Sequence, residues 1–381
     1  MMKKGALARF FQSSSGVIGL TGVLLLVIPA LYAPFIVNSR PFYMVVDGKI
    51  SFPFARYIFA PDSPESFIEQ LFNYSALLLP VCGIILFFIK RKILRLVLLS
   101  LAALLLLIPF LTVREVVDKR DYRKICSQEN VKSCFAVINS GPFETVGSPC
   151  QAPDKKHILG CDDIGRDVAA RLIYGARASL ATGVFSSLIA LFIGCSVGLA
   201  AGFKRGVFDL ITMRFVEILL CFPSFLLLLI LMSLLGDRQL GQSIPLVIAV
   251  LGFTGWIGIA FLVRGETLKQ RNLPYIESCI VSGIPETRIM FFHLLPNVVF
   301  PVLIAFTFGI AGSILAESSL SFLGFGVKAP APSWGGLLRQ AFDNPLDHWH
   351  LTVFPGAALF IAVMSFNFVG EGLRKALSVK E

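Results

Sequence analysis

The sequence has few charged residues. Asp, Glu, Lys and Arg make up 15% of its 381 residues, whereas hydrophobic residues make up 55% and the mean hydropathy is +0.77. An ordinary soluble domain carries about 25% charged residues. The composition therefore excludes that class and predicts a membrane protein.

Motifs of common catalytic and nucleotide-binding sites are also missing. The chain contains no G-x-x-x-x-G-K-[ST] or H-E-x-x-H pattern. These patterns build a phosphate-binding loop and a zinc site, respectively. The four histidines are few and scattered along the chain. We therefore expect no catalytic residue, no metal and no cofactor bound by this chain.

Long apolar runs dominate what is present. A helix needs about 20 mostly apolar residues to cross a bilayer core. Eight runs approach or exceed this length: 16–37, 73–89, 93–113, 178–202, 214–236, 244–263, 297–317 and 352–372. They predict an all-α, polytopic bundle of about eight transmembrane helices. The first run is longer than a signal-peptide core, so we expect an uncleaved anchor.

Basic residues indicate the orientation of the bundle. Lys and Arg cluster before the first run, in Lys90–Arg95, in Phe203–Met213, in 264–296 and in the tail. Basic residues in short loops favour the cytoplasmic side. We therefore expect both termini to be cytoplasmic and the chain to lie in a cytoplasmic membrane. The Lys and Arg residues that give the net charge of +10 flank the spans and do not form a basic patch with aromatic residues. This distribution argues against nucleic-acid binding.

This topology divides the chain into segments. We expect a cytoplasmic N-terminus with the first span, an outer segment, a transmembrane hairpin, a second outer segment with cysteines, a membrane core with a cytoplasmic loop, and a cytoplasmic tail. Their predicted ranges are 1–37, 38–72, 73–113, 114–177, 178–372 (loop 264–296) and 373–381.

Four of the eight cysteines lie in the second outer segment, at Cys126, Cys134, Cys150 and Cys161. An oxidising compartment and little core of its own favour two disulfides in such a segment. Three pairings are possible, and four reduced thiols are the alternative. No Cys-x-x-Cys spacing supports a zinc site.

The loop between the sixth and seventh runs is too polar to be a span. It contains YIESCIVSGIPETRIMFFHLLPN, residues 275–297. Pro274 suits the first turn of a helix, Gly283 can end it with a positive φ, and Pro285 can start a second helix. We expect two short helices with an apolar stripe through Ile276, Cys279 and Ile280 and then Ile289, Phe292 and Leu295 or Pro296. Such a stripe outside the membrane requires packing, either on the chain's own helix ends or on a partner.

Three ordered motifs carry a family resemblance. The loop resembles the EAA loop of ABC importer permeases, with Ser278 and Cys279 where the family prefers alanines. HILGCDDIGRDVAARLIYGARASL, from His157, is similar to a motif of the peptide permeases, with Cys161 in place of threonine. The stretch from Glu317, ESSLSFLGFGVKAPAPSWG, resembles another motif of the peptide permeases. Together they cover about 157–372 and indicate the C-type transmembrane subunit of oligopeptide and dipeptide importers.

The resemblance implies a type I importer core of six helices and a subunit that moves peptides. A separate cytoplasmic ATPase would use the ATP, a homologous second permease would complete the path, and an extracytoplasmic peptide-binding protein would deliver the substrate. This chain itself would also contact membrane lipid. The residues that it places at the ATPase are Glu277, Ser278, Cys279, Gly283, Pro285, Arg288, Ile289, His293, Leu295 and Pro296.

The pair of runs over 73–113 departs from the family, whose members pass directly from the first span to the outer segment. We interpret it as an inserted, lipid-facing hairpin. Two alternatives remain at this point: a permease for nickel or another small solute, and a secondary transporter. A secondary transporter would need its own coupling-ion site, commonly with broken helices.

Overall fold

The computed structural model describes residues 4–46, 49–59, 66–112, 122–126, 131–236 and 243–377. The stretch between the fifth and sixth predicted runs and the end of the predicted tail fall largely outside these residues. The chain forms two compact units, each described by itself below. The first comprises Met1–Leu25, Ser179–Lys328 and Ala357–Glu381, and the second comprises Leu26–Ala178 and Ala329–Gly356.

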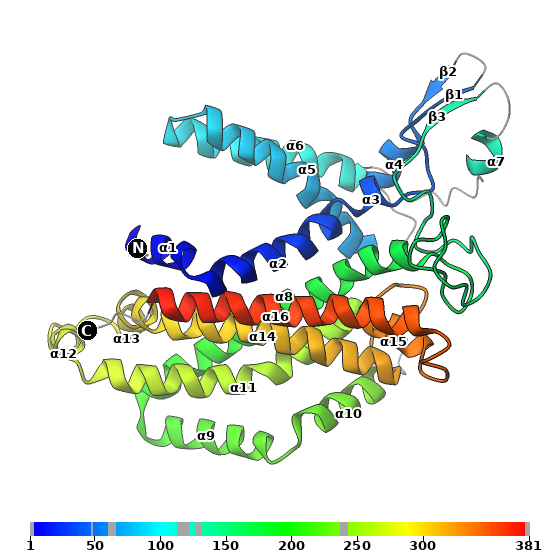
Figure 1. The fold of residues 1–381 in the computed structure, drawn as a ribbon. Coiled ribbons are helices and arrows are strands. Elements are labelled where there is room, and N and C mark those ends of the chain that lie inside the picture. Colours follow the sequence, from blue (N-terminus) through cyan, green and yellow to red (C-terminus); the bar gives the residue numbers. More distant parts are fainter. Residues whose placement is uncertain are drawn as a thin grey trace. The chain divides into compact units, whose positions relative to one another are not determined.

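Long apolar helices make up most of the described chain (Figure 1). Six are long and apolar enough to cross a membrane, and a bent pair raises the number to seven if it counts as one span. The six include α2 (Ser14–Leu31), α5 (Ser66–Phe88), α8 (Val168–Lys204), α11 (Ile244–Arg271), α14 (Leu295–Leu323) and α16 (Trp349–Leu377). Helices suit a bilayer because each satisfies its backbone hydrogen bonds internally. The predicted class, a helical polytopic membrane protein, is confirmed.

The fifth predicted run, 214–236, is not one continuous helix. Helices α9 (Gly206–Leu220) and α10 (Ser224–Gly236) meet at a bend of 83°. Pro223 lies at the break; proline has no backbone N–H and disfavours helical geometry in the residue before it. Helix α9 also begins at Gly206, inside the stretch assigned above to a cytoplasmic loop.

Helices of the first unit pack closely around small residues. Helix α11 packs along α14 (Figure 1). Along α8, a Cβ at Gly194 would lie 2.7 Å from Ile259 Cβ, and one at Gly198 would lie 2.6 Å from the Ala260 carbonyl oxygen. The Gly194-x-x-x-Gly198-x-x-x-Gly202 face is therefore a packing surface against α11, as such spacing predicts.

The second unit contains a small sheet that the sequence did not predict. Strands β1 (Tyr43–Val46), β2 (Lys49–Ser51) and β3 (Lys132–Cys134) form an antiparallel sheet in the order β2-β1-β3. Strands of three or four residues are too short to show a period-2 pattern clearly. Because β1 and β3 flank the α5–α6 hairpin in sequence, their pairing joins the chain on the two sides of that hairpin. Short helices α3 (Ala33–Ile36), α4 (Pro53–Phe59), α7 (Tyr122–Cys126) and α15 (Trp334–Gln340) complete this unit, and α1 (Lys4–Gln12) belongs to the first unit.

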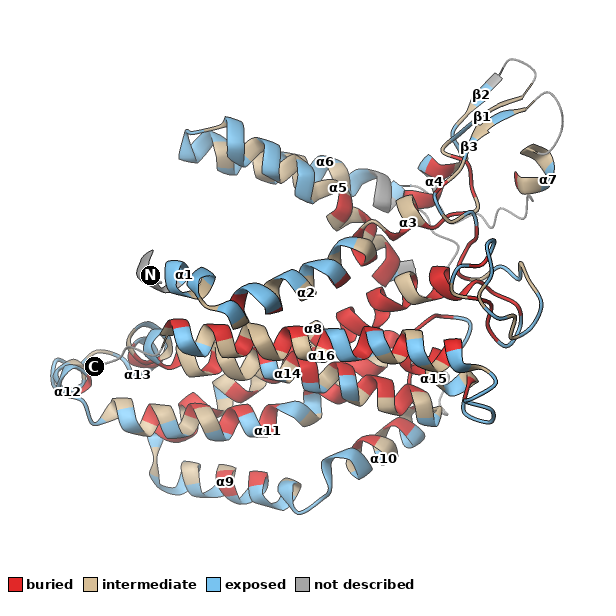
Figure 2. Ribbon diagram, in the orientation of Figure 1, coloured by how far each residue is buried: buried red, intermediate tan, exposed pale blue. Residues whose placement is uncertain are grey.

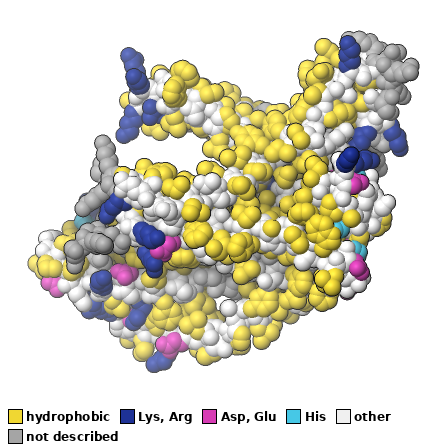
Figure 3. Space-filling view, in the orientation of Figure 1, with side chains coloured by type: hydrophobic (Ala, Val, Ile, Leu, Met, Phe, Trp, Pro, Cys, Tyr) yellow, Lys and Arg dark blue, Asp and Glu magenta, His cyan; other side chains and the backbone are white. Residues whose placement is uncertain are grey.

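Helices α5 and α6 (Lys92–Thr112) form the hairpin, which lies over the predicted range 73–113. The half of the hairpin near its turn is apolar and exposed: Phe87 and Ile93 are each 80% exposed. Lys and Arg gather at the turn itself (Figure 3). Its base is buried and polar. Arg177, on α8, donates from Nη2 to Asn73 Oδ1 (2.9 Å) and Leu31 O (3.1 Å), and from Nε to Ala30 O (2.7 Å). One guanidinium thus caps the end of α2 and holds the base of the hairpin.

Candidate functional site

The segment between α11 and α14 starts with a helix whose ends match its sequence. Helix α12 spans Pro274–Val281, with Pro274 in its first turn. Ser282 is its C-cap, and the next residue, Gly283, has a φ of +71°. The Gly283 N–H donates to Ile280 O (3.0 Å) and the Ile284 N–H donates to Cys279 O (3.2 Å). These two bonds form a Schellman motif, which favours glycine at this position.

The second half of the segment differs from the prediction. Helix α13 (Glu286–Arg288), with Pro285 as its N-cap, continues into a π-helical turn, η1 (Ile289–Leu294), which continues into α14. There is therefore no separate second helix joined to the span by Leu295 and Pro296. A π-helical turn holds more residues than an α-helical turn, so the face predicted from 3.6-residue spacing shifts. Phe292 is 74% exposed, and Met290 and Leu294 are buried in its place.

One face of the segment is anchored in the first unit. Ile276, Ile289 and Leu294 are each at most 1% exposed and join a core of α8, α9 and α11 side chains. Cys279 and Leu295 pack against the same core. Part of the predicted stripe therefore packs on the chain's own helices and holds the segment in place, whereas its members Ile280 and Phe292 are exposed.

The opposite face is exposed, as Figure 2 shows at the α12 and α13 end of the unit. It combines charged Glu277 and Arg288 with apolar Ile280 (43% exposed) and Val281 (88% exposed). Ser278, Gly283, Pro285 and Pro296 are also exposed, and His293 is half-buried. Apolar side chains beside charges on an anchored surface are typical of a protein-binding site. We call this face the α12 knob, defined by Glu277, Ser278, Ile280, Val281 and Arg288.

Tyr275 and Asn297 hold the segment in position through hydrogen bonds, although the sequence did not predict this role. Asn297 Nδ2 donates to the Tyr275 hydroxyl (3.0 Å), which donates to Gln270 Oε1 (3.0 Å). This chain of bonds links α14, α12 and α11. Asn297 stands in the motif quoted above, but Tyr275 is 22 residues away and only the fold brings the two together.

A hollow of about 520 Å³ lies in the same unit, among α8, α10, α11 and α14. Its lining carries no charged residue, but it has hydroxyl groups at Ser187, Ser224, Thr254 and Ser313. A Cβ at Gly258 or Gly312 would meet no atom within 4 Å. The lining therefore suits an uncharged, hydrogen-bonding solute segment. Because α11 and α14 flank the knob segment in sequence, both helices that leave the knob also line the hollow.

Two acidic residues of the predicted apolar runs, Glu217 and Glu317, have different surroundings. Glu217 pairs with Arg214 at 2.7 Å, and the two side chains are 50% and 71% exposed, so this pair lies outside the packed core of the unit. Glu317, in the third motif, is fully buried and accepts from Ser179 Oγ (3.0 Å) and Ser321 Oγ (2.7 Å). It thereby ties α14 to α8.

The second motif forms a buried polar cluster in the other unit. Asp162 is fully buried and accepts from Arg166 Nε (2.7 Å), while Gly165 supplies a φ of +84° at the turn between them. Asp167 caps α8 through Ala170 N (3.0 Å) and pairs with His157 Nδ1 (2.9 Å). The residues that make this motif distinctive therefore stabilise the start of α8.

The four cysteines of the outer segment are free thiols in the structure, and the two disulfides suggested by their clustering are not formed in its described part. Cys161 is fully buried beneath Gly147, and Cys134 is exposed on β3. Burial, with the nearby Asp167 and Asp162 carboxylates, raises the pKa of Cys161 to about 11. This thiol is therefore protected from oxidation at neutral pH.

Comparison with known proteins gives a consistent result. Residues 176–380 match the family described as binding-protein-dependent transport system inner membrane component. The chain is 38% identical over 230 residues to the glutathione transport system permease protein GsiD of Pectobacterium atrosepticum (60% of this chain, 75% of the relative). It is 38% identical over 226 residues to the oligopeptide transport system permease protein OppC of Haemophilus influenzae (59% and 71%). It is also 38% identical over 229 residues to the dipeptide transport system permease protein DppC of Bacillus subtilis (60% and 70%).

Proposed function

Because this chain belongs to the family of binding-protein-dependent transport system inner membrane components, we propose that it is the permease subunit of an ATP-driven peptide importer. The family description supports a location in the inner membrane, with a substrate-binding protein and an ATPase as partners. The names of the three relatives, which are permeases for glutathione, oligopeptides and dipeptides, support a peptide as the substrate.

One observation carries the mechanism: the α12 knob and the hollow are joined by continuous helices. Helix α11 runs from the hollow to the knob, and α13, η1 and α14 run back to it without a break. A partner that binds the knob and moves it therefore also moves residues that line the hollow. The ATPase closes on ATP, pulls the knob, and changes the width of the hollow through Gly258 on α11 and Gly312 on α14.

Contacts within the segment transmit this movement. Ile276 and Ile289 anchor the knob to the helix bundle, and the Tyr275–Asn297 bond makes α12 move with α14. Glu277 and Arg288 supply the charged contacts to the ATPase, and Ile280 and Val281 supply the apolar ones. The chain itself hydrolyses no ATP in this mechanism.

The sidedness follows from the distribution of Lys and Arg. Both termini and the α12 knob lie on the cytoplasmic side, whereas the sheet and the second motif lie outside. A homologous second permease faces the hollow, and the peptide passes between the two chains. The uncharged lining accommodates peptides with varied side chains, because it offers hydroxyl groups to the peptide backbone rather than a charged pocket.

A crosslinking pair tests this proposal. We expect Val281→Cys, at a position 88% exposed on the knob, to form a crosslink to a co-purifying ATPase. Val137→Cys is the matched control, because Val137 is 89% exposed in the segment predicted to lie outside. In whole cells, a membrane-impermeant thiol reagent should react with Val137→Cys and not with Val281→Cys. A knob cysteine that reacts from outside, or a complex purified without an ATPase, would refute the proposal.

A further inference from the structure

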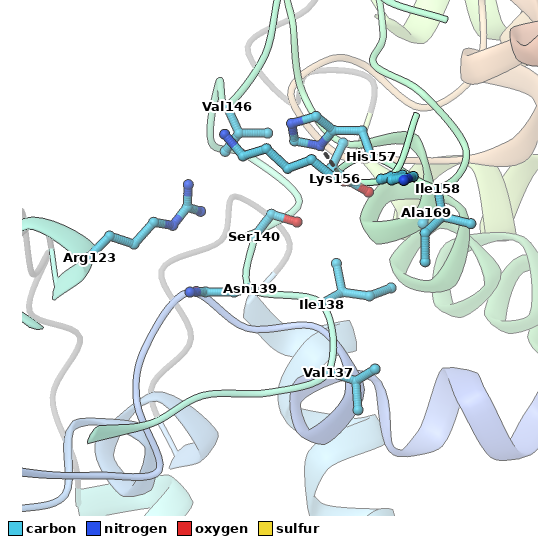
Figure 4. Close-up of a pocket in the computed structure, with 12 residues that line it drawn as sticks. Arg123, Val137, Ile138, Asn139, Ser140, Val146, Lys156, His157, Ile158 and Ala169 are labelled. Atoms are coloured by element: carbon cyan, nitrogen blue, oxygen red, sulfur yellow. Dashed lines mark hydrogen bonds and ion pairs between the residues drawn. The ribbon is translucent and has the colours of Figure 1, made fainter. Parts of the chain in front are cut away.

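The second unit contains a cavity that the transport mechanism does not use. Its volume is about 360 Å³, within the range of small-ligand sites. The segments 137–140 and 155–158 line it, together with Arg123 from α7, Val146, Asp167 and Ala169 (Figure 4). All of these residues belong to the second unit.

Ser140 supplies the first sign of a ligand. Its side chain is 3% exposed, and its hydroxyl has no hydrogen-bond partner among the residues that the structure describes. Figure 4 shows this hydroxyl pointing into the space bounded by Ile138, His157 and Ala169. Burial of a hydroxyl without a partner is unfavourable, so a serine here is costly unless a bound group uses it.

The polar wall beside Ser140 is fixed. His157 is 4% exposed, and its Nδ1 pairs with Asp167 Oδ2 at 2.9 Å. The other Asp167 oxygen accepts from Ala170 N at 3.0 Å. Both carboxylate oxygens of Asp167 therefore accept hydrogen bonds from the protein. Asp167 forms part of the cavity wall and not a cation site.

The remaining charges in the lining are positive. Lys155 and Lys156 are exposed at the cavity and form no ion pair with another described residue. Arg123 already pairs with Glu144 at 2.7 Å, so it adds little net charge. Two lysines without an ion pair, together with one engaged carboxylate in the lining, favour a bound anion with one negative charge over an anion with two.

Apolar side chains complete the cavity. Ile138, Val146 and Ile158 line it, and Ile158 is 67% exposed although it lies among polar groups. We infer that the cavity binds a small organic monoanion, whose carboxylate accepts hydrogen bonds from Ser140 and Lys156 and whose short apolar group covers Ile138 and Ile158. This inference depends only on the second unit, and it holds whatever solute the transporter carries.

Calorimetry on the complete transporter in lipid nanodiscs tests the inference with N-acetylvaline as the probe. We expect saturable binding, and binding of the neutral N-acetylvalinamide to be weaker by about tenfold or more, because charge-assisted hydrogen bonds are lost. Ser140→Ala and Lys156→Gln should each weaken N-acetylvaline binding by roughly tenfold. Lys132→Gln, on β3 outside the cavity, is the charge-matched control and should bind like the wild type.

The thermal midpoint without ligand separates a binding role of Ser140 from a structural one. Ser140→Ala should leave that midpoint unchanged or raise it, because the variant removes an unpaired buried hydroxyl. A lower midpoint would show that Ser140 serves the fold and would overturn the inference. Equal binding of the acid and the amide, tighter binding of inorganic phosphate, or wild-type affinity in Ser140→Ala would overturn it as well.

Discussion

The glycines along α8 and those around the hollow belong to the same unit, but a side chain would meet different surroundings in the two places. At Gly198 a Cβ would lie 2.6 Å from a backbone oxygen of α11, and at Gly202 it would lie 2.8 Å from Thr267 Cβ. At Gly258 and Gly312 it would meet no atom within 4 Å. The first set lets two helices touch, whereas the second keeps a space open. Glycine content alone therefore does not distinguish packing from a pathway.

The packed set should give the largest effect. Gly198→Leu forces a side chain against the Ala260 carbonyl, which belongs to a helix backbone that cannot rotate away. We expect it to destabilise the folded chain by about 3 kcal/mol, at the upper end of typical overpacking costs. Thermal unfolding in detergent measures this, with Gly312→Leu as the size-matched control. Equal midpoints for the two variants would abolish the distinction between the sets.

The open set should affect transport instead of stability. We expect Gly312→Leu to change the free energy of unfolding by less than about 1 kcal/mol, since its side chain enters empty space and helix propensity favours leucine. Most of the peptide uptake should be lost because the leucine side chain narrows the hollow. Uptake of a labelled peptide by cells measures this, with Gly312→Ala as the smaller control. Normal uptake by the Leu variant would show that the hollow is not on the path.

A third glycine sharpens the comparison because its surroundings are open but its backbone is constrained. At Gly283 a Cβ would meet no atom within 4 Å, yet φ is +71°. Gly283→Val should cost on the order of 1 kcal/mol or more through backbone strain, and it should reduce the peptide imported per ATP hydrolysed.

Gly283→Asn is the control for this position, because asparagine tolerates a positive φ better than other residues. We expect the Asn variant to keep most of its coupling. The ratio of uptake to ATP hydrolysis in proteoliposomes measures both variants. A Val variant that couples like the wild type would contradict the proposed role of the Schellman turn at the knob.

Local chemistry made part of the candidate site predictable. Pro274, Gly283 and Pro285 predicted a helix, a positive φ and a second helix start, and the structure has Pro274 in the first turn of α12 and a φ of +71° at Gly283. The roles of the knob residues, from Glu277 to Pro296, stay a prediction. Phe292 does not share the buried face of Ile276 and Ile289, because the π-helical turn changes the face on which it lies.

Other features were hidden for physical reasons that the residues make clear. Pro223 was visible in the sequence, but the apolar run around it continued on both sides, so the 83° bend did not show in hydropathy. The bond between Tyr275 and Asn297 depends on two helices meeting. The cysteines of the outer segment suggested disulfides by their number, whereas the fold buries Cys161 and leaves Cys134 exposed.

The amino-acid sequence by itself determined that this is a helical membrane protein, because a bilayer admits apolar helices of sufficient length and little else. It also determined the shape of the α12 turn, which depends on neighbouring residues alone. Only the tertiary structure decided which glycines pack and which border a hollow, and that the knob and the hollow share two helices. Those properties depend on distances between residues far apart in the chain, and such distances are set by the packing of the helices together.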